Sequence, residues 1–169
     1  MEERIVLVDE EGNEIGHDEK LKVHLEGKLH KAFSIFIFNS KGELLLQKRA
    51  KDKYHSGGMW TNTCCSHQRE NESFNEALHR RLREEVGFDS ELEGIGNFIY
   101  KAEFDNGLIE YELDHVFIGN YDGEPKVNPS EIEEWKWIDL KGLKEDMALY
   151  PSKYTYWLKP ALQKVLEHI

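Results

Sequence analysis

Apolar runs bounded by turn-forming residues predict strands in the amino-terminal part of the chain. Residues 5–8 form a short apolar run, and residues 32–38 and 43–48 form two longer runs. Turn-forming residues separate the two longer runs, so we expect them to pair as a hairpin. The segment between the first two runs carries His24 and His30 and is expected to be irregular.

A helix is predicted at residues 73–86. Its apolar residues recur at helical spacing, namely Ala77, Leu78, Leu82 and Val86. Ser73 is a favourable capping residue because its hydroxyl can accept a hydrogen bond from the first turn. Gly87 stands where the helix is expected to end.

The pattern predicts further elements, namely strands at residues 97–103, 109–119 and 135–138 and a helical tail at residues 140–169. Asp105-Asn106-Gly107 is a strong hairpin signal between the first two of these strands. Pro151 and a second position near Pro160 are expected to interrupt the tail. This mixture of strands and helices predicts an α/β fold.

Composition limits the class of protein. The 169 residues suit one well-filled domain spanning residues 1–169, and no linker-like stretch, membrane-length apolar run or repeat is present. The two cysteines, Cys64 and Cys65, are adjacent, a spacing that does not form a structural disulfide. We therefore expect a protein of the reducing cytoplasm that does not cross a membrane.

The net charge of −11 disfavours a nucleic-acid partner because no long basic stripe is available to contact phosphates. An anionic small molecule would need a few cationic side chains or metal ions gathered in one pocket. We predict no obligate protein partner.

The segment from Trp60 to His67 has the groups of a metal-assisted acid/base site. Cys65 lies two residues before His67, and a helix rich in carboxylates follows. A thiol can hold or deliver a proton, and an imidazole can bind a divalent cation. An isolated cysteine and histidine would more often be a buried thiol beside a surface histidine, but this context favours chemistry.

Glu110 and Glu112 are two residues apart in a predicted strand, so they project to the same face. Two like charges there are costly unless a cation or proton lies between them. A solvent-exposed stripe is the alternative. Asp114 and Tyr121 do not continue a simple polar face, which disfavours that alternative.

Residues 66–88 resemble the Nudix box. Aligned on Glu84 and Glu85, the pattern puts Ser66 in the glycine position and Arg81 in a glutamate position. In Nudix hydrolases that glutamate helps to gather magnesium ions around a pyrophosphate. Its replacement argues against ordinary hydrolysis.

The whole chain is similar to the type I isopentenyl-diphosphate isomerases of the Nudix superfamily. The resemblance rests on motifs in the same order, namely residues 29–50, Trp60-Thr61-Asn62-x-x-Cys65-x-His67, Arg80-Arg81, Glu110-Tyr111-Glu112 and Tyr156-Trp157. It implies a Nudix-type α/β/α sandwich with a mixed sheet. It also implies interconversion of isopentenyl and dimethylallyl diphosphate for isoprenoid biosynthesis, by antarafacial protonation and deprotonation through a tertiary carbocation.

The resemblance assigns the catalytic groups. Cys65 would serve one face of the substrate and Glu112 the other, with Tyr100 beside the carboxylate. Cys65 is chosen over Cys64 because it matches Cys-x-His, and Cys64 is expected to pack. Trp157 would lie against the hydrocarbon tail and stabilise the cation.

The resemblance also implies two metal sites. The first would hold zinc, manganese or magnesium through His24, His30, His67, Glu110 and Glu112. A second ion, Mg²⁺, would arrive with the diphosphate and bind Glu85. Lys20, Arg49, Lys53 and Arg81 would bind the diphosphate. The other histidines are expected to be structural, namely His17, His55, His79, His115 and His168.

Three alternatives stay open. A Nudix hydrolase of a nucleoside diphosphate derivative is the first, disfavoured by Arg81 and Cys65. The second is a catalytically silent metal-binding module, which would be expected to have lost Cys65, Tyr100, Glu110 or Glu112. The third is a flavin-dependent type II isomerase, for which the chain is too short and too poor in glycine-rich phosphate loops.

Overall fold

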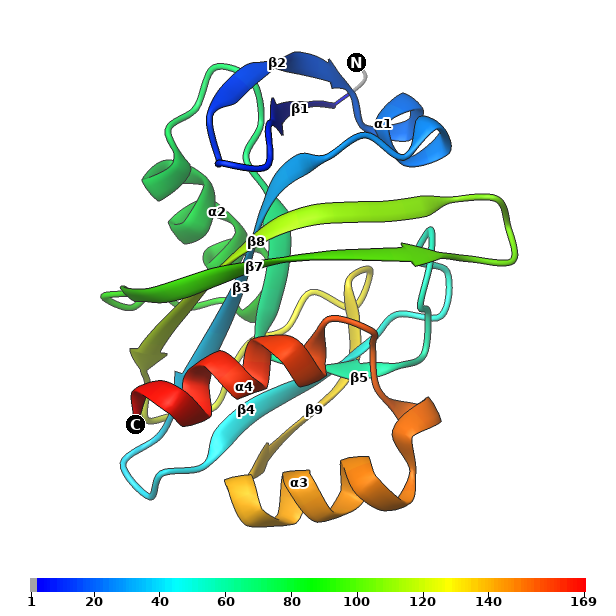
Figure 1. Ribbon diagram of the computed structural model, residues 1–169. Coiled ribbons are helices and arrows are strands. Elements are labelled where there is room, and N and C mark those ends of the chain that lie inside the picture. Colours follow the sequence, from blue (N-terminus) through cyan, green and yellow to red (C-terminus); the bar gives the residue numbers. More distant parts are fainter. Residues whose placement is uncertain (1–2) are drawn as a thin grey trace.

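The computed structural model describes residues 3–169 and contains a mixed sheet flanked by helices (Figure 1). Its strands are β1 (Arg4–Val8), β2 (Glu14–Glu19), β3 (His30–Phe38), β4 (Leu44–Arg49), β5 (Trp60–Thr61), β6 (Cys64–His67), β7 (Glu93–Glu103), β8 (Ile109–Asn120) and β9 (Ile132–Ile138). Its helices are α1 (Lys20–Glu26), α2 (Phe74–Val86), α3 (Leu140–Leu149) and α4 (Leu158–His168), with the 3₁₀ helix η1 (Pro151–Lys153) between the last two.

Strand β3 organises the sheet. It runs parallel to β8 and antiparallel to β1, β4 and β6, so the sheet is mixed as predicted. Both predicted hairpins form, β3 with β4 and β7 with β8. The parallel register sets His30 opposite Glu112, and the antiparallel register sets Ser34 opposite Cys65. These two pairings bring together residues that are far apart in the sequence.

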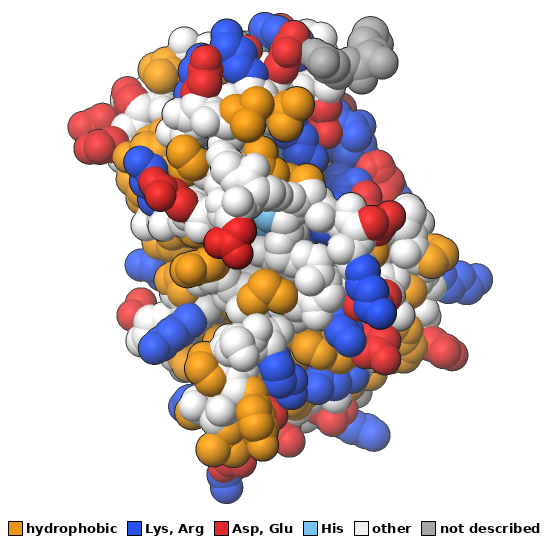
Figure 2. All heavy atoms as spheres, turned by 90° about the vertical axis from the view of Figure 1, so that its right-hand side faces the viewer, with side chains coloured by type: hydrophobic (Ala, Val, Ile, Leu, Met, Phe, Trp, Pro, Cys, Tyr) orange, Lys and Arg blue, Asp and Glu red, His pale blue; other side chains and the backbone are white. Residues whose placement is uncertain are grey.

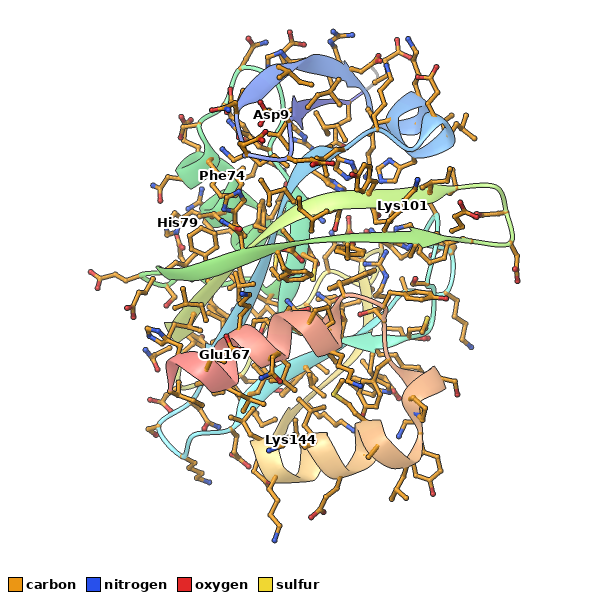
Figure 3. All side chains as sticks on the ribbon, viewed as in Figure 1. Asp9, Phe74, His79, Lys101, Lys144 and Glu167 are labelled. Atoms are coloured by element: carbon orange, nitrogen blue, oxygen red, sulfur yellow. The ribbon has the colours of Figure 1, made fainter. Side chains whose placement is uncertain are left out.

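The two faces of β3 pack against different helices, as strand alternation requires. Phe33 and Ile35 belong to the core beneath α2, whereas Phe36 belongs to the core beneath α4. Helices therefore cover both faces of the sheet, with α2 and α4 on opposite sides (Figure 1) and Phe74 on the α2 side (Figure 3). Burying each of these phenylalanines contributes about 1.5–3 kcal/mol to folding. The predicted sandwich is confirmed.

Helix α2 begins and ends where the sequence predicts. The Ser73 hydroxyl accepts a hydrogen bond from the backbone N–H of Glu76, and the Glu76 side chain bonds back to the Ser73 N–H. Gly87 ends the helix with φ of 76°, a left-handed conformation that favours glycine.

The segment before residue 30 was expected to be irregular, but it forms regular structure. It contains β2, which pairs with β1, and α1, which carries His24, while His30 is the first residue of β3. Strand β2 is largely exposed and α1 has seven residues, so neither has a long hydrophobic pattern. Two further strands, β5 and β6, were also not predicted, because each has four residues or fewer.

The helical tail is interrupted as predicted, at η1 and before α4. Pro160 is the third residue of α4, where its missing N–H costs no helical hydrogen bond. Among the helices of residues 3–169, none is long and apolar enough to cross a membrane.

Candidate active site

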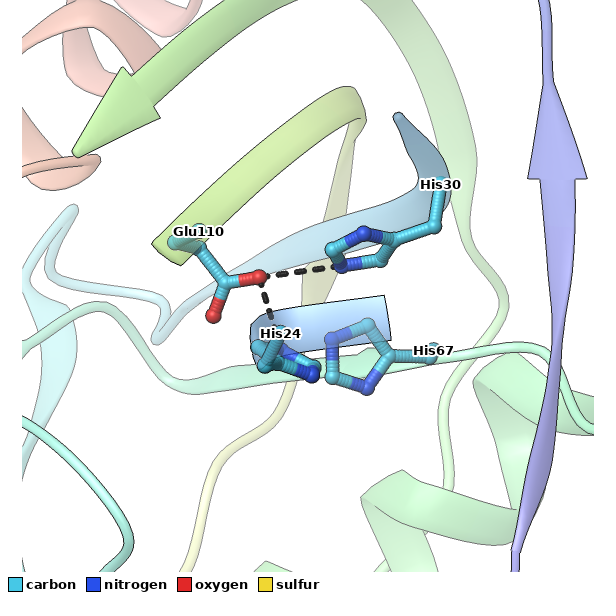
Figure 4. A group of neighbouring side chains, drawn as sticks. All are labelled: His24, His30, His67 and Glu110. Carbon is cyan, nitrogen blue, oxygen red and sulfur yellow. Dashed lines mark ion pairs between the residues drawn. The ribbon is translucent and has the colours of Figure 1, made fainter. Parts of the chain in front are cut away.

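Three histidines and a glutamate converge below the amino-terminal end of β3 (Figure 4). His24, His30, His67 and Glu110 are all buried, and their donor atoms lie within 4.8 Å of one another. Glu112 adjoins them, because its Oε2 lies 3.2 Å from His30 Nε2 and 3.1 Å from His67 Nε2. The five first-site residues predicted from the resemblance therefore form one cluster.

Each residue of the cluster comes from a different element or register position. Helix α1 supplies His24, the start of β3 supplies His30 and the end of β6 supplies His67. Glu110 and Glu112 occupy alternate positions of β8 and face the same histidines, as their spacing predicted. The sheet thus collects donors from across the chain.

Backbone contacts fix the orientation of two imidazoles. His24 Nδ1 lies 2.6 Å from the Lys20 carbonyl oxygen, and His30 Nδ1 lies 3.0 Å from that of Lys28. A carbonyl can only accept, so both Nδ1 atoms carry hydrogen, and Nε2 is available as a ligand.

The Nε2 atoms of His24 and His30 point at Glu110 Oε1, at 3.0 and 2.9 Å (Figure 4). Within the described part of the chain, His24 Nε2 and Glu110 Oε1 are nevertheless buried without an aligned hydrogen bond. A divalent cation between these atoms would satisfy them. The donor set of imidazoles and carboxylates fits such an ion.

The same cluster perturbs protonation. Burial disfavours the charged form of His30, but Glu110 and Glu112 outweigh it and raise the pKa of His30 to about 10. At His67, burial has the largest effect, and the positive charge of His30 adds to it. Together they outweigh the effect of Glu112 and lower the pKa of His67 to about 4. In the absence of metal, a protonated His30 therefore places a positive charge between the two glutamates.

His55 is a site residue that the sequence reasoning missed. It is buried, and its Nε2 lies 2.6 Å from Glu110 Oε2. His55 was expected to be structural, and the structure places it at the cavity in contact with Glu110. No spacing signal links it to the other histidines, because it lies in the turn-rich segment between β4 and β5. His79 is different, because it pairs with Asp89 on the surface (Figure 3).

The loop around His55 depends on small residues. Ser56 has φ of 54°, in the left-handed region that non-glycine residues rarely adopt. A Cβ on Gly57 would lie 2.3 Å from the Lys51 carbonyl oxygen, so only glycine fits there.

The two cysteines face opposite sides of β6. Cys64 is in the core beneath α2 and its Sγ lies 3.2 Å from Glu85 Oε2. Cys65 faces the cluster side, where its thiol donates to Asn62 Oδ1 at 3.0 Å and accepts the Trp157 Nε1–H at 3.0 Å. The prediction that Cys64 packs is confirmed, and Cys65 faces the site.

The thiol of Cys65 is held in its protonated form. Burial, followed by the negative charges of Asp114 and Glu85, raises its pKa to about 12. Asn62 also favours the thiol because it uses its N–H groups on the Ile35 and Cys64 carbonyls and leaves only Oδ1 for Cys65.

Tyr100 donates a short hydrogen bond to Glu112 Oε1. The carboxylate pKa is lowered because His30 and His67 outweigh burial and the charge of Glu110. The Tyr100 ring also lies 6.3 Å from the Trp157 ring, between centroids. Tyr100 and Trp157 thus line the same cavity as Glu112 and Cys65.

Asp114 continues the face of Glu110 and Glu112, which the sequence reasoning did not expect. It is 1% exposed and accepts the Ser34 hydroxyl at 2.7 Å. Burial and the charge of Glu112 raise its pKa well above the usual range. The face is therefore polar but buried, so the conclusion that it is not a solvent stripe holds.

The predicted diphosphate cations form a connected group. Lys20 and Lys53 lie 4.6 and 5.8 Å from the Tyr54 ring centroid, and Lys53 and Arg81 both contact Glu131 Oε2, at 2.5 and 3.3 Å. Burial and the charges of Lys53 and Arg81 lower the pKa of Lys20, despite Glu3. The three cations are thus close enough to repel one another.

Arg49 lies on the cavity side, with its guanidinium 5.2 Å from the Trp157 ring. Among the described residues, Arg49 Nε and Arg81 Nε are buried without a hydrogen-bond partner. Such unsatisfied donors suit an anionic ligand.

Glu85 is separate from the histidine cluster. Its carboxylate is bound by Gln47 Nε2, Arg81 Nη2 and Cys64 Sγ, at 3.0, 2.9 and 3.2 Å. Arg81, in the glutamate position of the box, thus lies on Glu85 and also contacts Glu84 at 3.3 Å. The positively charged guanidinium of Arg81 thus stands where Nudix hydrolases have a glutamate that helps to gather magnesium ions.

The chemical groups enclose a small cavity of about 20 Å³, lined by Cys65, Glu110, Glu112, Tyr100 and Trp157 among others. It has room for about one water molecule. On the face shown in Figure 2, only a small area of histidine is visible, in a recess. A larger cavity, about 740 Å³, lies between α3, η1 and α4 and has mainly apolar walls, so we place the chemistry in the small one.

Comparison with known proteins gives the family. The NUDIX domain matches residues 28–158. Isopentenyl-diphosphate Delta-isomerase 2 of Aromatoleum aromaticum is 51% identical over 166 residues, covering 98% of this chain and 88% of the relative. Isopentenyl-diphosphate Delta-isomerase 2 of Photorhabdus laumondii is 52% identical over 159 residues, covering 94% and 90%. The chain belongs to the isopentenyl-diphosphate Delta-isomerase family.

Solved structures agree on the fold of this isomerase family member. The DR0079 protein of Deinococcus radiodurans superimposes with a TM-score of 0.71 at 20% identity, covering 86% of this chain and 89% of that one. The MutT protein of Methanosarcina mazei superimposes with a TM-score of 0.67 at 20% identity, covering 83% and 95%. The predicted Nudix fold is confirmed.

Proposed function

We propose that the protein is an isopentenyl-diphosphate Delta-isomerase that interconverts isopentenyl and dimethylallyl diphosphate in isoprenoid biosynthesis. The observation that carries this proposal is the enclosure of a thiol, Cys65, and a carboxylate, Glu112, in one cavity beside a cluster of metal-binding groups. The family of its relatives supports the same activity.

The reaction moves a double bond by one position, so one carbon gains a proton and another loses one. We assign Cys65 to one face of the substrate and Glu112 to the other, in an antarafacial transfer. Because the reaction is reversible, each group is an acid in one direction and a base in the other. The Tyr100 hydroxyl, bonded to Glu112, would position that carboxylate and help to carry its proton.

A tertiary carbocation would form between the two proton transfers. Trp157 is assigned to stabilise it, because a cation over a desolvated indole face gains about 2 kcal/mol. The indole is buried, and its N–H already lies on Cys65 Sγ. Exclusion of water from the cavity would prevent capture of the cation as an alcohol.

We assign His24, His30, His67, Glu110 and Glu112 to a first divalent ion, either Zn²⁺, Mn²⁺ or Mg²⁺. Mg²⁺ is assigned to a second position with the diphosphate and Glu85. These ions would supply positive charge against the diphosphate and hold Glu112 in place. Glu85 would have to loosen its contact with Arg81 to take part.

Lys20, Arg49, Lys53 and Arg81 are assigned to the diphosphate. Two observations support this assignment. Among the described residues, the Nε atoms of Arg49 and Arg81 are buried without a hydrogen-bond partner, and Lys20 and Lys53 lie close to the Tyr54 ring. Binding an anion would relieve the repulsion that lowers the pKa of Lys20. The partner is thus a small-molecule diphosphate, and two free cysteines suit the cytoplasm.

The hydrolase alternative is less well supported. Hydrolysis needs the box glutamates free for magnesium, but Glu72 and Glu84 both pair with Arg80, at 2.7 and 2.9 Å. Arg81 stands in place of a further glutamate. Both features favour the isomerase.

Proton NMR of isopentenyl diphosphate with the purified protein and magnesium in deuterated water tests the proposal. We expect dimethylallyl diphosphate with deuterium incorporated, and the Cys65→Ala and Glu112→Gln variants then report which proton each group handles. An unchanged alkene with a folded, metal-loaded protein would reject the isomerase. Hydrolysis would then be tested with a panel of nucleoside diphosphates.

A further inference from the structure

His55 lies at the metal cluster without being one of its four converging donors. Its Nε2 is 2.6 Å from Glu110 Oε2, the oxygen on the other side of the carboxylate from His24 and His30. The donor atoms of His24, His30, His67 and Glu110 share one space, and His55 is not a member of that group. His55 therefore contacts Glu110, a proposed metal ligand, and does not itself face the space between the four donor atoms.

The contacts of the ring define its role. The Ser56 hydroxyl lies 3.1 Å from His55 Nδ1 and can donate to it, which leaves the ring hydrogen on Nε2 for Glu110 Oε2. Glu110 Oε2 is then held by His55, and Oε1 is directed at His24 and His30. In the Glu110 carboxylate, Oε2 thus bonds to His55, and Oε1 stays available for a metal.

Packing holds the His55 ring in this orientation. It stacks on Phe104, with centroids 4.4 Å apart and planes 5° apart, and meets Trp157 edge-on at 5.8 Å. Arg49 Nη2 donates to the His55 carbonyl at 3.2 Å. Phe104 and Trp157 therefore hold the ring, and Arg49 holds the backbone at His55.

We propose that His55 is a positioning residue, which fixes the Glu110 carboxylate for the first divalent ion. Hydrogen bonds to a metal-bound carboxylate orient the ligand, and losing such a partner typically costs 10–100-fold in metal affinity. The inference rests on the metal centre of the proposed function. It predicts a change in metal affinity that can be measured without measuring isomerisation.

The test is titration of Mn²⁺ into the metal-stripped protein, followed by electron paramagnetic resonance of free Mn²⁺. His55→Phe keeps a flat ring against Phe104 but cannot donate, so we expect its Kd to rise 10–100-fold. His55→Gln retains an N–H near the position of Nε2 and should stay within about threefold of wild type. The matched control is His115→Phe, on the same strand as Glu110 but in contact with Phe74.

Co²⁺ absorption separates positioning from direct ligation. We expect His55→Gln to keep the wild-type Co²⁺ spectrum, because the ligand set is unchanged. A changed spectrum with weakened Mn²⁺ binding would make His55 a direct ligand and overturn the proposal. Unchanged Mn²⁺ affinity in His55→Phe would also overturn it, as would a wild-type protein that binds no Mn²⁺.

Folding and function are checked separately. Thermal unfolding in chelator identifies a variant that fails to fold, and His55→Gln then still tests the proposal. If the wild type binds Mn²⁺ but does not isomerise isopentenyl diphosphate, the proposed function fails. A rise in Kd confined to His55→Phe would support the positioning role even then.

Discussion

At the scale of single residues, side-chain alternation and backbone anchoring decide which groups can do chemistry. Neighbouring cysteines have opposite environments because β6 directs one side chain to the core and the next to the cavity. Two histidines are bound to carbonyls at Nδ1, so their Nε2 atoms face the same carboxylate. Both effects come from the backbone and not from the identity of the side chains.

Cys65→Ala should abolish turnover with the fold intact, whereas Cys64→Ala should keep most of it. Loss of an acid/base group typically lowers kcat by 10²–10⁴-fold. Cys64→Ala removes a buried sulfur from the core and should cost about 1 kcal/mol of stability. Steady-state kinetics and urea unfolding of both variants measure these effects. Equal losses of activity would contradict the assignment.

Binding of the first metal should release about one proton from His30. Glu110 and Glu112 raise the pKa of His30 to about 10 in the metal-free protein, so Nε2 is protonated at neutral pH and must lose its proton to bind an ion. Without metal, this proton stabilises the fold fully below the unfolded pKa of about 6.5, and the stabilisation is lost as pH rises through about 10.

Isothermal titration calorimetry at pH 7.5, in buffers of different ionisation enthalpy, measures the release. His30→Gln should release about one proton fewer than the wild type. Release should also fall to nothing for this group well above pH 10. Equal proton release in the wild type and His30→Gln would show that a metal does not replace this proton.

At the scale of elements, length and local signals determine what the sequence reveals. Helix α2 has thirteen residues, a capping box and a terminal glycine, and its bounds were predicted. Helix α1 has seven residues and its N-cap Glu19 makes no side-chain hydrogen bond, so it was missed. Isolated helices this short are marginal, and α1 is ordered by its contacts with the rest of the protein.

The same distinction applies to the site. Strand spacing alone predicted that Glu110 and Glu112 share a face, and the structure confirms it. The histidines could be grouped only through the family resemblance, because His30 and His67 meet through sheet pairing between distant segments and His24 is carried by the short helix α1. His55 lies outside the family motifs that were used, so neither kind of reasoning found it.

Metal should therefore stabilise α1 more than α2. His24 joins α1 to the cluster, so opening this helix would break the site, and metal at 100 times its Kd would oppose the opening by about 2.7 kcal/mol. We expect hydrogen exchange of residues 20–26 to slow by about 100-fold on adding metal. The core of α2, with its own cap, is the internal control. Equal exchange and equal protease resistance with and without chelator would contradict this.

At the scale of the whole molecule, an acidic protein has to bind an acidic substrate in a small cavity. The net charge of −11 is offset locally by Lys20, Lys53 and Arg81, two of which share the carboxylate of Glu131. The cavity itself holds about one water molecule, far less than a five-carbon diphosphate needs. We therefore expect substrate binding to displace part of the cavity wall.

Trp157 is the wall residue whose movement follows from the structure. It lies between η1 and α4, next to the helix start at Leu158, and its N–H donates to Cys65 Sγ across the wall of the cavity. A hydrocarbon chain between Trp157 and Cys65 would break that hydrogen bond. The indole N–H would then lose its hydrogen bond to Cys65 Sγ, and the indole would contact the substrate hydrocarbon instead.

Tryptophan fluorescence should report this exchange. We expect the emission to change when dimethylallyl diphosphate is added with Mg²⁺, and much less with inorganic pyrophosphate, which lacks the hydrocarbon. Trp157→Phe should lose the signal, and Trp137→Phe, in the core beneath α2, should keep it. Because cation–π stabilisation of about 2 kcal/mol corresponds to roughly 30-fold in rate, Trp157→Ala should lower kcat by about that factor and Trp157→Phe by less. A full signal in Trp157→Phe would mean that the cavity opens at another part of its wall.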